Sequence, residues 1–594
     1  MPKLVHTSVC CAFCVCALNV RASTVRMRYL ALASDYDGTL AHDGVVDDAT
    51  VEAIERLNHS GRKFILVTGR ELPDLQSAFP RLDLCALVVA ENGALLYTPQ
   101  TRETRVLADP PPGSFVNRLR EKGVTDMSVG EVIVATWHPY ERQAIEAIRE
   151  SGLELQIIFN KDAVMILPSG VNKMTGLCCA LDDLKLSRHN VVGVGDAEND
   201  HAFLESCECS VAVANAIPSL KEKADLLTKG ARGAGVTELI DKLIENDLSD
   251  VAPTLGRYCI CVGKSDQGDV NLPAYGRNVL VCGSSGSGKS TLVTGILERI
   301  MDKKYQICLI DPEGDYENLP GCRTVGDQKR PPDVEHVKQV LADPSAQVIV
   351  NLVGVGAADR ADYFALMVSE IQNQRLRTGR PHWLAIDEAH HVLPWEWAHT
   401  STALPDELAN LLLITVHPKH VSPMALRKMN TMLVVGREPG KLFEEFANAI
   451  HKPRPDVPRE DLPRGEAVYW SMDDNKVQKI KTVPSRNEHL RHRRKYAEGQ
   501  LDPERMFHFR GPHCSLDLRA QNLNIFVQIA EGIDTDTWWF HLKRRDYSTW
   551  LRHGIKDGDL ADEVSKIEEN DSLSDKESRD QVKDAILRKY TVPA

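Results

Sequence analysis

Two aspartates, Asp35 and Asp37, stand two residues apart at the end of a short apolar run, and Gly38 and Thr39 follow them. The run predicts a buried strand, and side chains at the end of such a strand project into the crevice at the edge of the sheet. Gly38 would permit the sharp turn that follows. One carboxylate can attack phosphorus to give an aspartyl phosphate while the other moves protons. The spacing therefore predicts covalent phosphoryl transfer, although D-x-D-G alone also fits an ordinary turn.

Three further polar residues follow in the order that this chemistry requires. Thr68 ends the next apolar run, where its hydroxyl can hold a phosphate oxygen, and Lys173 can neutralise the phosphate and the nucleophile. Asp196 ends another apolar run. Together with Asp35 it would supply the hard oxygen ligands that Mg²⁺ prefers. Such an ion offsets the repulsion between an anionic nucleophile and an anionic phosphate.

The four motifs resemble those of the haloacid dehalogenase superfamily, which carries D-x-D-G-T, a Thr, a Lys and G-D-x-x-N-D in this order. Residues 91–94, Glu-Asn-Gly-Ala, and the position of Lys173 resemble the Cof-type, C2-capped branch. Members of that branch dephosphorylate sugar phosphates and related metabolites. The resemblance covers residues 28–245 and departs from none of the core motifs. It implies a phosphatase for a small phosphorylated substrate, with a cap at about 97–167 that selects it.

The resemblance also implies a role for each motif residue. Asp35 would be the nucleophile, Asp37 the acid and base, and Thr68 and Lys173 would bind the substrate phosphate. Asp35, the backbone carbonyl of Asp37 and Asp196 would bind Mg²⁺, and Asp200 would stand behind them. Two alternatives stay open within the superfamily, because some members are phosphotransferases and others have lost activity.

A second phosphate-binding motif begins after the apolar run 278–282 and fits the pattern G-x4-G-K-[ST]. Glycines let backbone N–H groups curl around phosphates, and the N-terminus of the following helix favours the anion. Lys289 would reach the β- and γ-phosphates of ATP, and Ser290 would ligate Mg²⁺. The predicted nucleotide-binding residues are Gly283, Ser285, Gly286, Ser287, Gly288, Lys289, Ser290 and Thr291.

Asp387 and Glu388 end another apolar run and supply the second half of a nucleotide site. Asp387 would join the Mg²⁺ shell, and Glu388 would polarise the attacking water, so we expect ATP hydrolysis as well as binding. Thr415 or His417, at the end of the next run, is a candidate sensor of the γ-phosphate. Arg437 is a candidate arginine finger, although an ordinary surface arginine is the commoner interpretation.

Residues 311–316, Asp-Pro-Glu-Gly-Asp-Tyr, resemble the D-P-x-G-[DE]-Y segment of the HerA and VirB4 group of translocating ATPases, as does the G-x-x-G-S-G-K-S form of the loop. The resemblance covers residues 255–440. It implies a ring-forming motor, and therefore a homo-oligomer, that pulls DNA or protein. The sequence carries no zinc finger, no RNP motif and no basic stripe with interleaved aromatics, so nucleic acid is a partner that we do not favour.

Alternating strands and helices predict an α/β fold. We expect a Rossmannoid phosphatase core with an α+β cap, then a P-loop (RecA/HerA-like) α/β domain and a small, mainly helical C-terminal module. The predicted buried strands are 29–34, 63–67, 86–90, 191–194, 278–282, 305–310, 346–352, 382–386, 411–415 and 431–435. The expected boundaries are a phosphatase at 28–245, a linker at 246–254, an ATPase at 255–484, the helical module at 485–570 and a charged tail at 571–594.

Residues 1–27 predict either a leader or a mis-assigned start. Their apolar run, 9–20, resembles the core of a signal peptide and is too short to span a bilayer comfortably. We favour synthesis from Met27, because a secreted ATPase would not meet ATP. The rest of the chain lacks 18 uninterrupted apolar residues, so we expect a cytoplasmic protein without a membrane partner. The net charge of −13 argues against a broad grip on DNA or anionic lipid.

The leading hypothesis is a bifunctional protein. A phosphatase would hydrolyse a small phosphorylated metabolite, with a sugar phosphate as the first expectation. An attached ATPase would regulate it, assemble the protein or translocate a partner. One alternative is a nucleic-acid translocase with the phosphatase as an accessory, and another is a regulatory scaffold in which one site is silent. Salt-dependent DNA binding would distinguish the translocase from the leading hypothesis.

Overall fold

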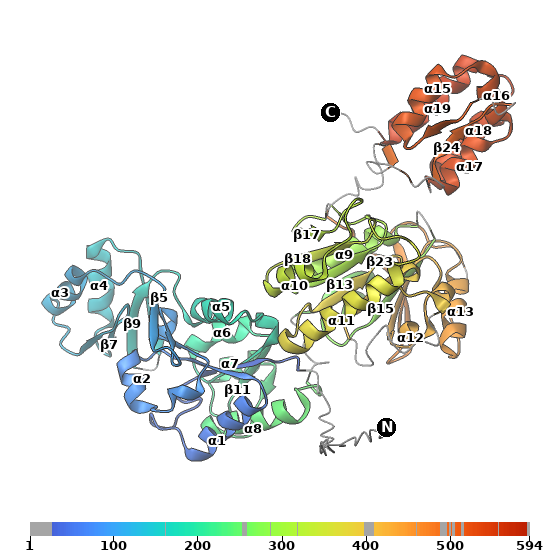
Figure 1. Cartoon of the computed structure of the whole chain (residues 1–594). Coiled ribbons are helices and arrows are strands. Elements are labelled where there is room, and N and C mark those ends of the chain that lie inside the picture. The colour runs from blue at the N-terminus through green and yellow to red at the C-terminus, as the bar shows by residue number, and fades with distance from the viewer. Residues whose placement is uncertain are drawn as a thin grey trace, which may run out of the picture.

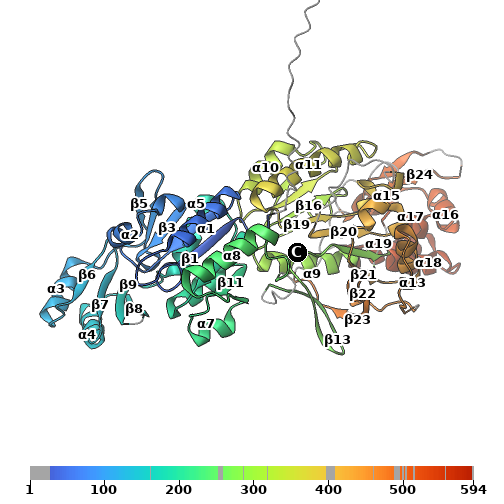
Figure 2. The same ribbon diagram turned by 90° about the horizontal axis from the view of Figure 1, so that it is seen from below.

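A computed structural model describes residues 27–160, 162–251, 258–284, 287–317, 319–396, 409–458, 460–486, 496–497, 501, 505–512, 516–555 and 557–590. Within these ranges the elements form a core domain, a cap inserted into it, a P-loop domain and a C-terminal module (Figure 1). The cap lies at the end of the core domain away from the P-loop domain, as both ribbon views show (Figures 1 and 2).

The core domain is built on an eight-stranded sheet in the order β12-β11-β10-β1-β2-β3-β4-β5. The strands from β12 to β3 are parallel, and β4 and β5 continue the sheet as an antiparallel hairpin. Its strands are β1 (Ala31–Asp35), β2 (Lys63–Val67), β3 (Leu87–Ala90), β4 (Leu95–Thr98), β5 (Glu103–Val106), β10 (Val191–Gly195), β11 (Cys209–Ala212) and β12 (Leu226–Leu227). Its helices are α1 (Asp48–His59), α2 (Leu72–Ala78), α5 (Lys173–Leu184), α6 (His201–Ser206), α7 (Pro218–Lys223) and α8 (Arg232–Asn246). The central strands are buried, as expected for a parallel sheet covered on both faces.

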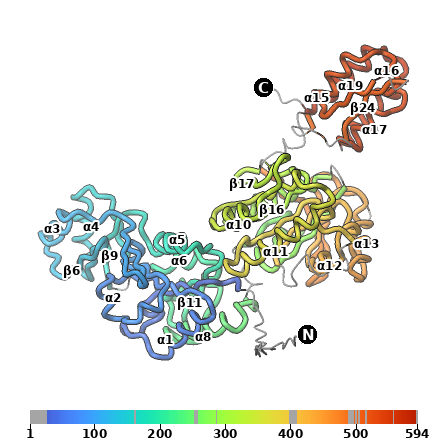
Figure 3. The backbone as a smooth tube through the Cα atoms, viewed as in Figure 1, coloured from blue at the N-terminus to red at the C-terminus, as the bar shows by residue number. Residues whose placement is uncertain are grey.

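The cap is a four-stranded antiparallel sheet in the order β6-β7-β9-β8, with two helices packed on it. Its elements are α3 (Gly113–Glu121), β6 (Met127–Val129), β7 (Val134–Trp137), α4 (Glu141–Ser151), β8 (Leu155–Asn160) and β9 (Ala163–Pro168). The tube view shows the chain leaving the core domain for the cap and returning to it (Figure 3). The cap boundary that we expected at residue 97 is too early, because β4 pairs with β3, and β5 with β4, in the core sheet.

The P-loop domain holds an eleven-stranded sheet in the order β14-β13-β23-β22-β21-β15-β20-β19-β16-β18-β17. The strands from β21 to β17 are parallel, and the other four are antiparallel. Its strands are β13 (Ile260–Ser265), β14 (Gly268–Leu272), β15 (Val279–Gly283), β16 (Ile307–Asp311), β17 (Cys322–Val325), β18 (Gln347–Asn351), β19 (Trp383–Ile386), β20 (Leu411–Thr415), β21 (Thr431–Val435), β22 (Glu466–Ser471) and β23 (Lys476–Thr482). Its helices are α9 (Lys289–Asp302), α10 (Val334–Ala342), α11 (Arg360–Thr378), α12 (Pro423–Leu426) and α13 (Pro439–Ile450).

In the described part of the C-terminal module, a two-stranded sheet and the helices α15 to α19 surround an aromatic core. Its elements are β24 (Phe507–Phe509), β25 (Leu518–Ala520), α15 (Leu523–Gly532), α16 (Thr535–Lys543), α17 (Asp546–His553), α18 (Gly558–Glu568) and α19 (Asp575–Tyr590). We expected a charged tail from residue 571, but α19 buries Val582 and Ile586 in this core. The expected boundary at residue 570 is therefore wrong, because buried residues of α19 belong to the core of the module and the helix packs on α18, α15 and α16.

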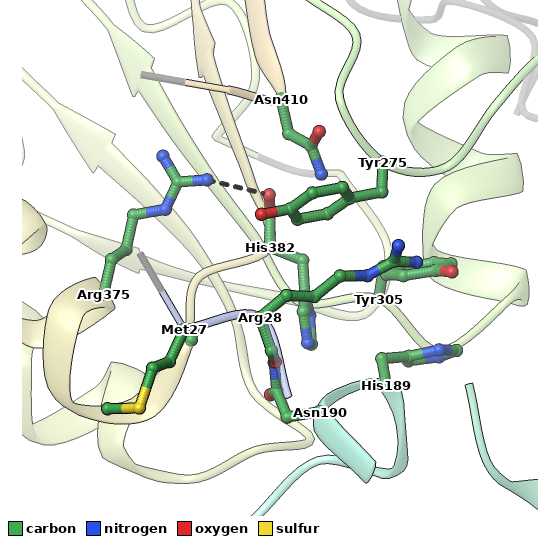
Figure 4. A pocket seen from close by; sticks show the side chains of 10 residues that line it. Met27, Arg28, His189, Asn190, Tyr275, Tyr305, Arg375, His382 and Asn410 are labelled. Atoms are coloured by element: carbon green, nitrogen blue, oxygen red, sulfur yellow. Dashed lines mark hydrogen bonds between the residues drawn. The ribbon is translucent and has the colours of Figure 1, made fainter. Parts of the chain in front are cut away.

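Buried polar residues join the core domain to the P-loop domain (Figure 4). Glu208 directly precedes β11 of the core domain, and Tyr305 lies just before β16 of the P-loop domain. Both carboxylate oxygens of Glu208 lie within 2.9 Å of the Tyr305 hydroxyl. Arg28 donates to the same carboxylate, and its guanidinium also stacks on Tyr275 of the P-loop domain. Burial raises the pKa of Glu208, but Arg28 and His189 outweigh it and lower this pKa to about 2.

His189 is the central residue of this interface. Its Nδ1 lies 2.7 Å from a Glu208 oxygen, and its Nε2 lies 2.7 Å from the backbone oxygen of Lys303, directly after α9. Its ring also stacks on Tyr305 with a centroid distance of 3.7 Å. His189 therefore links the two domains, through a carboxylate on one side and a backbone oxygen on the other.

Candidate active sites

The first candidate site lies where β1, β2 and β10 end. These strands are parallel neighbours, with Asp35 opposite Val67 in β2 and Ser34 opposite Val194 in β10. The carboxyl ends of parallel strands meet at one edge of a sheet, where ligands bind in α/β folds. Asp35, Thr68 and Asp196 therefore come together there. Helix α5 brings Lys173 to the same edge as its first residue.

Lys173 connects two of the predicted carboxylates. Its Nζ donates to Asp35 at 2.5 Å and to Asp200 at 2.7 Å, and all three side chains are buried. The other oxygen of Asp200 accepts from the backbone N–H groups of Asp196 and Ala197. Asp200 thus stands behind Asp196 and holds the turn after β10 in place.

The charges at this site are not balanced by the protein alone. Burial, followed by the charge of Asp200, raises the pKa of Asp35 to about 8, although Lys173 acts in the opposite direction. Burial lowers the pKa of Lys173, but the neighbouring Asp200 and Asp35 outweigh it and raise this pKa above its ordinary value. Lys173 therefore stays charged, and Asp35 needs further positive charge to be ionised at neutral pH.

The residues present fit a divalent cation. Asp35, Asp196 and Asp200 are buried and offer oxygen atoms that all lie within 4.8 Å of one another, and among the described residues they form the one such group. Gly38 has φ +88, and a Cβ there would lie 2.4 Å from an Asp196 oxygen. Glycine therefore lets the turn close on this carboxylate. Carboxylate oxygens suit Mg²⁺, with Asp35 and Asp196 as the side chains that would hold it.

Asp37 is engaged by a residue that sequence analysis did not single out. Arg70 donates from Nε and Nη2 to the two oxygens of Asp37, each at 2.7 Å, and it also pairs with Asp74. Thr68 is fully buried, and its hydroxyl accepts from the Arg70 backbone N–H at 3.1 Å. The signal for Arg70 was its position two residues after Thr68. The roles assigned to Asp37 and Thr68 stay predictions.

The second candidate site lies where β15 and β19 end in the P-loop domain. Gly283 ends β15, Gly288 has φ +94, and Lys289 opens α9, so the predicted strand and helix flank the motif. Ser290 and Thr291 form the first turn of α9. Ser285 and Gly286, which we predicted to bind nucleotide, lie outside the described residues.

Lys289 and Glu388 contact each other across this site. The Lys289 Nζ lies 3.1 Å from a Glu388 oxygen, and Glu388 adopts the left-handed conformation with φ +37. Burial, followed by the charge of Glu388, raises the pKa of Asp387, while Lys289 lowers it. Asp311 and Asp315 raise it further, so this site also gathers more negative than positive charge.

The three weaker candidates occupy different places. The hydroxyl of Thr415, at the end of β20, lies 3.3 Å from His390, which in turn lies 3.5 Å from Glu388. His417 instead lies 3.6 Å from Glu445. Arg437 is exposed, and after Arg552 it contributes to lowering the pKa of Asp562 in α18 of the same chain. Thr415 therefore lies near His390 and Glu388 of the second site, whereas Arg437 lies towards the C-terminal module.

Further charged residues extend the second site towards the C-terminal module. Glu313, within the Asp-Pro-Glu-Gly-Asp-Tyr segment, lies 3.5 Å from His391 and 3.5 Å from Arg505. Arg505 belongs to the C-terminal module, where its backbone oxygen accepts from the Trp550 indole. The sequence signal for His390 and His391 was their position two and three residues after Glu388. Nothing in the sequence indicated Arg505.

Among the residues that the structure describes, no helix is both long and apolar enough to cross a membrane.

Comparisons with known proteins agree with this division of the chain. Residues 32–125 and 120–240 match the family model of haloacid dehalogenase-like hydrolases. Residues 269–374 match the model of the central domain of helicase HerA.

Two curated relatives each match a little over a third of the chain. Phosphoglycolate phosphatase 2 of Saccharolobus solfataricus is 31% identical over 228 residues, which are 37% of this chain and 94% of that protein. The phosphoglycolate phosphatase of Methanothermobacter thermautotrophicus is 29% identical over 222 residues, which are 36% of this chain and 98% of that protein. A solved haloacid dehalogenase-like hydrolase from Bacteroides thetaiotaomicron is 18% identical over 36% of this chain and 100% of its own, with a TM-score of 0.32. The chain belongs to the haloacid dehalogenase-like hydrolase family, with a HerA-like P-loop domain fused behind the hydrolase.

Proposed function

We propose that the core domain hydrolyses a small phosphorylated metabolite through an aspartyl phosphate on Asp35, and that Mg²⁺ is its cofactor. The observation that carries this proposal is the buried contact of Lys173 with Asp35 and Asp200 beside Asp196. A buried lysine and a cation offset the charge of both nucleophile and phosphate, as phosphoryl transfer requires. The relatives named as phosphoglycolate phosphatases make 2-phosphoglycolate the first substrate to test, ahead of sugar phosphates.

The reaction divides into two balanced steps. An Asp35 oxygen attacks phosphorus, the bond from phosphorus to the ester oxygen breaks, and Asp37 gives its proton to that leaving oxygen. Water then attacks the same phosphorus and gives a proton to Asp37, and the bond to Asp35 breaks to release inorganic phosphate. Lys173 neutralises Asp35 and the phosphate, and the Thr68 hydroxyl holds a phosphate oxygen. When bound, Mg²⁺ supplies positive charge, held by Asp35, Asp196 and the Asp37 carbonyl.

The experiment is a turnover screen of the full chain on 2-phosphoglycolate and a panel of sugar phosphates, with and without Mg²⁺. Trapping the acyl phosphate on the wild type, and its absence in Asp35→Asn, tests the intermediate. A wild type that releases no phosphate from any of these compounds with Mg²⁺ present would overturn the proposal.

We also propose that the P-loop domain binds and hydrolyses ATP with Mg²⁺. The contact between Lys289 and Glu388 supports this, because it places the predicted phosphate-binding lysine beside the predicted water-polarising carboxylate. In the bound state the γ-phosphate would replace Glu388 as the partner of Lys289 and leave Glu388 to orient water. Ser290 and Asp387 would hold the ion, and ATP turnover by the full chain, lost in Lys289→Ala, is the test.

The match to the HerA central domain supports a second candidate, in which the chain is a ring-forming translocase and the phosphatase an accessory. Light scattering of Glu388→Gln, with and without ATP, tests for a nucleotide-driven homo-oligomer, because this variant should retain the nucleotide. A strictly monomeric mass in both conditions would count against the ring. DNA binding that weakens steeply with salt would favour a nucleic-acid partner over a regulatory role.

A further inference from the structure

Glu91 is a buried carboxylate that the mechanism above does not use. It opens the short turn η2 (Glu91–Gly93) directly after β3, and its side chain is fully buried. Its φ is +50 and that of Asn92 is +54, so two successive non-glycine residues adopt the left-handed conformation. Such backbone is uncommon and is kept only where its surroundings require it. The strained turn therefore points to a specific task for this side chain.

The Glu91 carboxylate binds the backbone of the cap. One oxygen accepts from the N–H of Glu131 at 2.9 Å, and the other accepts from Val132 at 2.8 Å and Ile133 at 2.9 Å. These three residues belong to the turn between β6 and β7. A Cβ on Gly130 in this turn would lie 2.6 Å from a Glu91 oxygen, so the carboxylate fills the concave side of the turn.

The turn that carries Glu91 also contacts the catalytic segments of the core domain. The Glu91 N–H donates to the Arg70 oxygen at 3.0 Å, and the Asn92 N–H donates to the Thr68 oxygen at 2.9 Å. A Cβ on Gly93 would lie 1.9 Å from the Asn172 oxygen, the residue before Lys173. The Asn92 side chain accepts from Asn199, one residue before Asp200. One short turn therefore touches the segments of Thr68, Lys173 and Asp200 and holds the cap as well.

Apolar residues surround these hydrogen bonds. Val132 and Ile133 of the cap are buried together with Met165 of β9 and with Ala94, which follows η2. A Cβ on Gly69 would lie 2.9 Å from the end of Met165, so β9 reaches over the Thr68 segment. Because apolar side chains surround them, the three amides cannot readily exchange Glu91 for water as their acceptor. Loss of one Glu91 oxygen would therefore leave a buried N–H donor unsatisfied.

We propose that Glu91 is a positioning residue that holds the cap closed over the phosphatase site and thereby sets the affinity for substrate. This inference rests on the proposed phosphatase function. Only an ionised carboxylate can accept three N–H groups here without presenting a donor of its own. In Glu91→Gln the side-chain amide places an N–H opposite at least one backbone N–H, with little change in shape. The cap would then spend less of its time closed, and apparent affinity falls in proportion to the closed fraction.

Two measurements on the whole chain test this inference. Hydrogen–deuterium exchange, followed on peptides that span residues 127–137, reports directly on the three amides. We expect exchange in Glu91→Gln to be faster by about tenfold or more, because each lost hydrogen bond joins an amide to a charged acceptor. With p-nitrophenyl phosphate as the probe, we expect KM to rise about tenfold while kcat stays within a factor of about three, since bound substrate restores closure.

Two further variants make the result specific. Glu121→Gln makes the same chemical change on α3 of the cap at an exposed position, and it should alter neither measurement. Glu91→Asp keeps an acceptor-only carboxylate one methylene shorter, and it should give a KM between those of the wild type and Glu91→Gln. The same two measurements on Glu91→Asp decide the question if the glutamine variant does not fold.

The outcomes separate this inference from the proposed function. Unchanged exchange at residues 131–133 in Glu91→Gln would overturn it, as would a loss of kcat with KM unchanged, the pattern expected of a merely structural residue. If the wild type hydrolyses no phosphate ester, the proposed function fails. Amide exchange still decides whether Glu91 holds the cap.

Discussion

The two candidate sites have the same kind of components and are assembled differently. In the core domain Lys173 is shared by Asp35 and Asp200, and these residues come from elements of one sheet and the helix behind it. In the P-loop domain Lys289 contacts one carboxylate, Glu388, and the surrounding charges continue through Glu313 to Arg505 of another module. The predicted residues of the first site all lie in the core domain, whereas the charged residues near the second site continue into the C-terminal module. Substitutions at the first site should therefore affect the core domain alone. The effect of substitutions at the second site should also depend on how the C-terminal module packs on the P-loop domain.

The largest expected effect is that of Asp35→Asn. The amide keeps the shape of the side chain but loses the nucleophilic charge, so phosphate-ester hydrolysis should fall by a factor on the order of 10⁴ or more. ATP turnover should stay near the wild-type rate, because the two sites lie on separate sheets. Phosphate release and ATP turnover measured on the same preparations check both statements. Full phosphatase turnover by this variant would contradict the assigned mechanism.

Glu388→Gln should reduce ATP turnover by roughly 10² to 10³-fold, the usual contribution of a positioned base. ATP should still bind, because Lys289 stays in place. Lys289→Ala is the contrasting variant and should weaken binding itself. Nucleotide titration followed by steady-state turnover separates the two effects. Wild-type turnover in Glu388→Gln would show that another residue orients the water.

A smaller effect should appear in the pH dependence of stability without metal. Burial, then Asp200, raises the pKa of Asp35 to about 8, against 3.8 for an unperturbed aspartate. Between these values the folded state binds a proton that the unfolded state has lost, so the free energy of unfolding should fall as pH rises. The slope should reach at most about 1.4 kcal/mol per pH unit.

Urea unfolding between pH 5 and pH 8 in a chelator measures this slope. Asp35→Asn should flatten it, whereas Asp109→Asn, at an exposed position of the same domain, should not. Mg²⁺ should stabilise the wild type most at the alkaline end, because ion binding favours the charged carboxylate. Equal slopes in Asp35→Asn and the wild type would show that Asp35 is not the group responsible.

The smallest expected effect is that of Arg505→Ala on ATP turnover. The contact of Arg505 with Glu313 is 3.5 Å long and partly exposed, and such pairs contribute about 0 to 1 kcal/mol. We expect a decrease of a few-fold at most. Arg519→Ala, which removes an exposed arginine that pairs with Asp517 inside the C-terminal module, is the matched control. Equal turnover in the two variants would indicate that the second site is as self-contained as the first.

The sequence predicted the parallel strands well because each is a continuous apolar run. The predicted strands 63–67, 411–415 and 431–435 coincide with β2, β20 and β21. The antiparallel strands were missed. β14 has only two buried residues, and β13 pairs with β23 from far along the chain, at Gly263 opposite Thr482. A short, half-exposed strand such as β14 carries a weak periodic signal, and the partner of β13 cannot be inferred from local composition.

The residues of the candidate sites likewise divide into those that the sequence predicted and those that it did not. The motif residues Asp35, Lys173 and Asp196 could be named from the sequence because their spacing is tied to strand ends. Glu91 was noted only as part of a resemblance, since its partners are backbone N–H groups, which any sequence provides. Arg505 carried no signal, because its contact with Glu313 depends on how the C-terminal module packs. Sequence spacing thus predicts chemistry within one sheet and not contacts between modules.

The hydrogen bonds of His189 have a consequence for how the protein unfolds. Its two partners, Glu208 and the Lys303 oxygen, lie on opposite sides of the boundary between the core and P-loop domains. Separation of the domains would leave Arg28, His189 and Glu208 without the aromatic cover of Tyr275 and Tyr305, and would open a closely packed polar interface to water. If either domain unfolds by itself, the interface is therefore lost as well. The two domains should unfold in one cooperative transition, and a fragment cut in the linker should be less stable than the same residues in the intact chain.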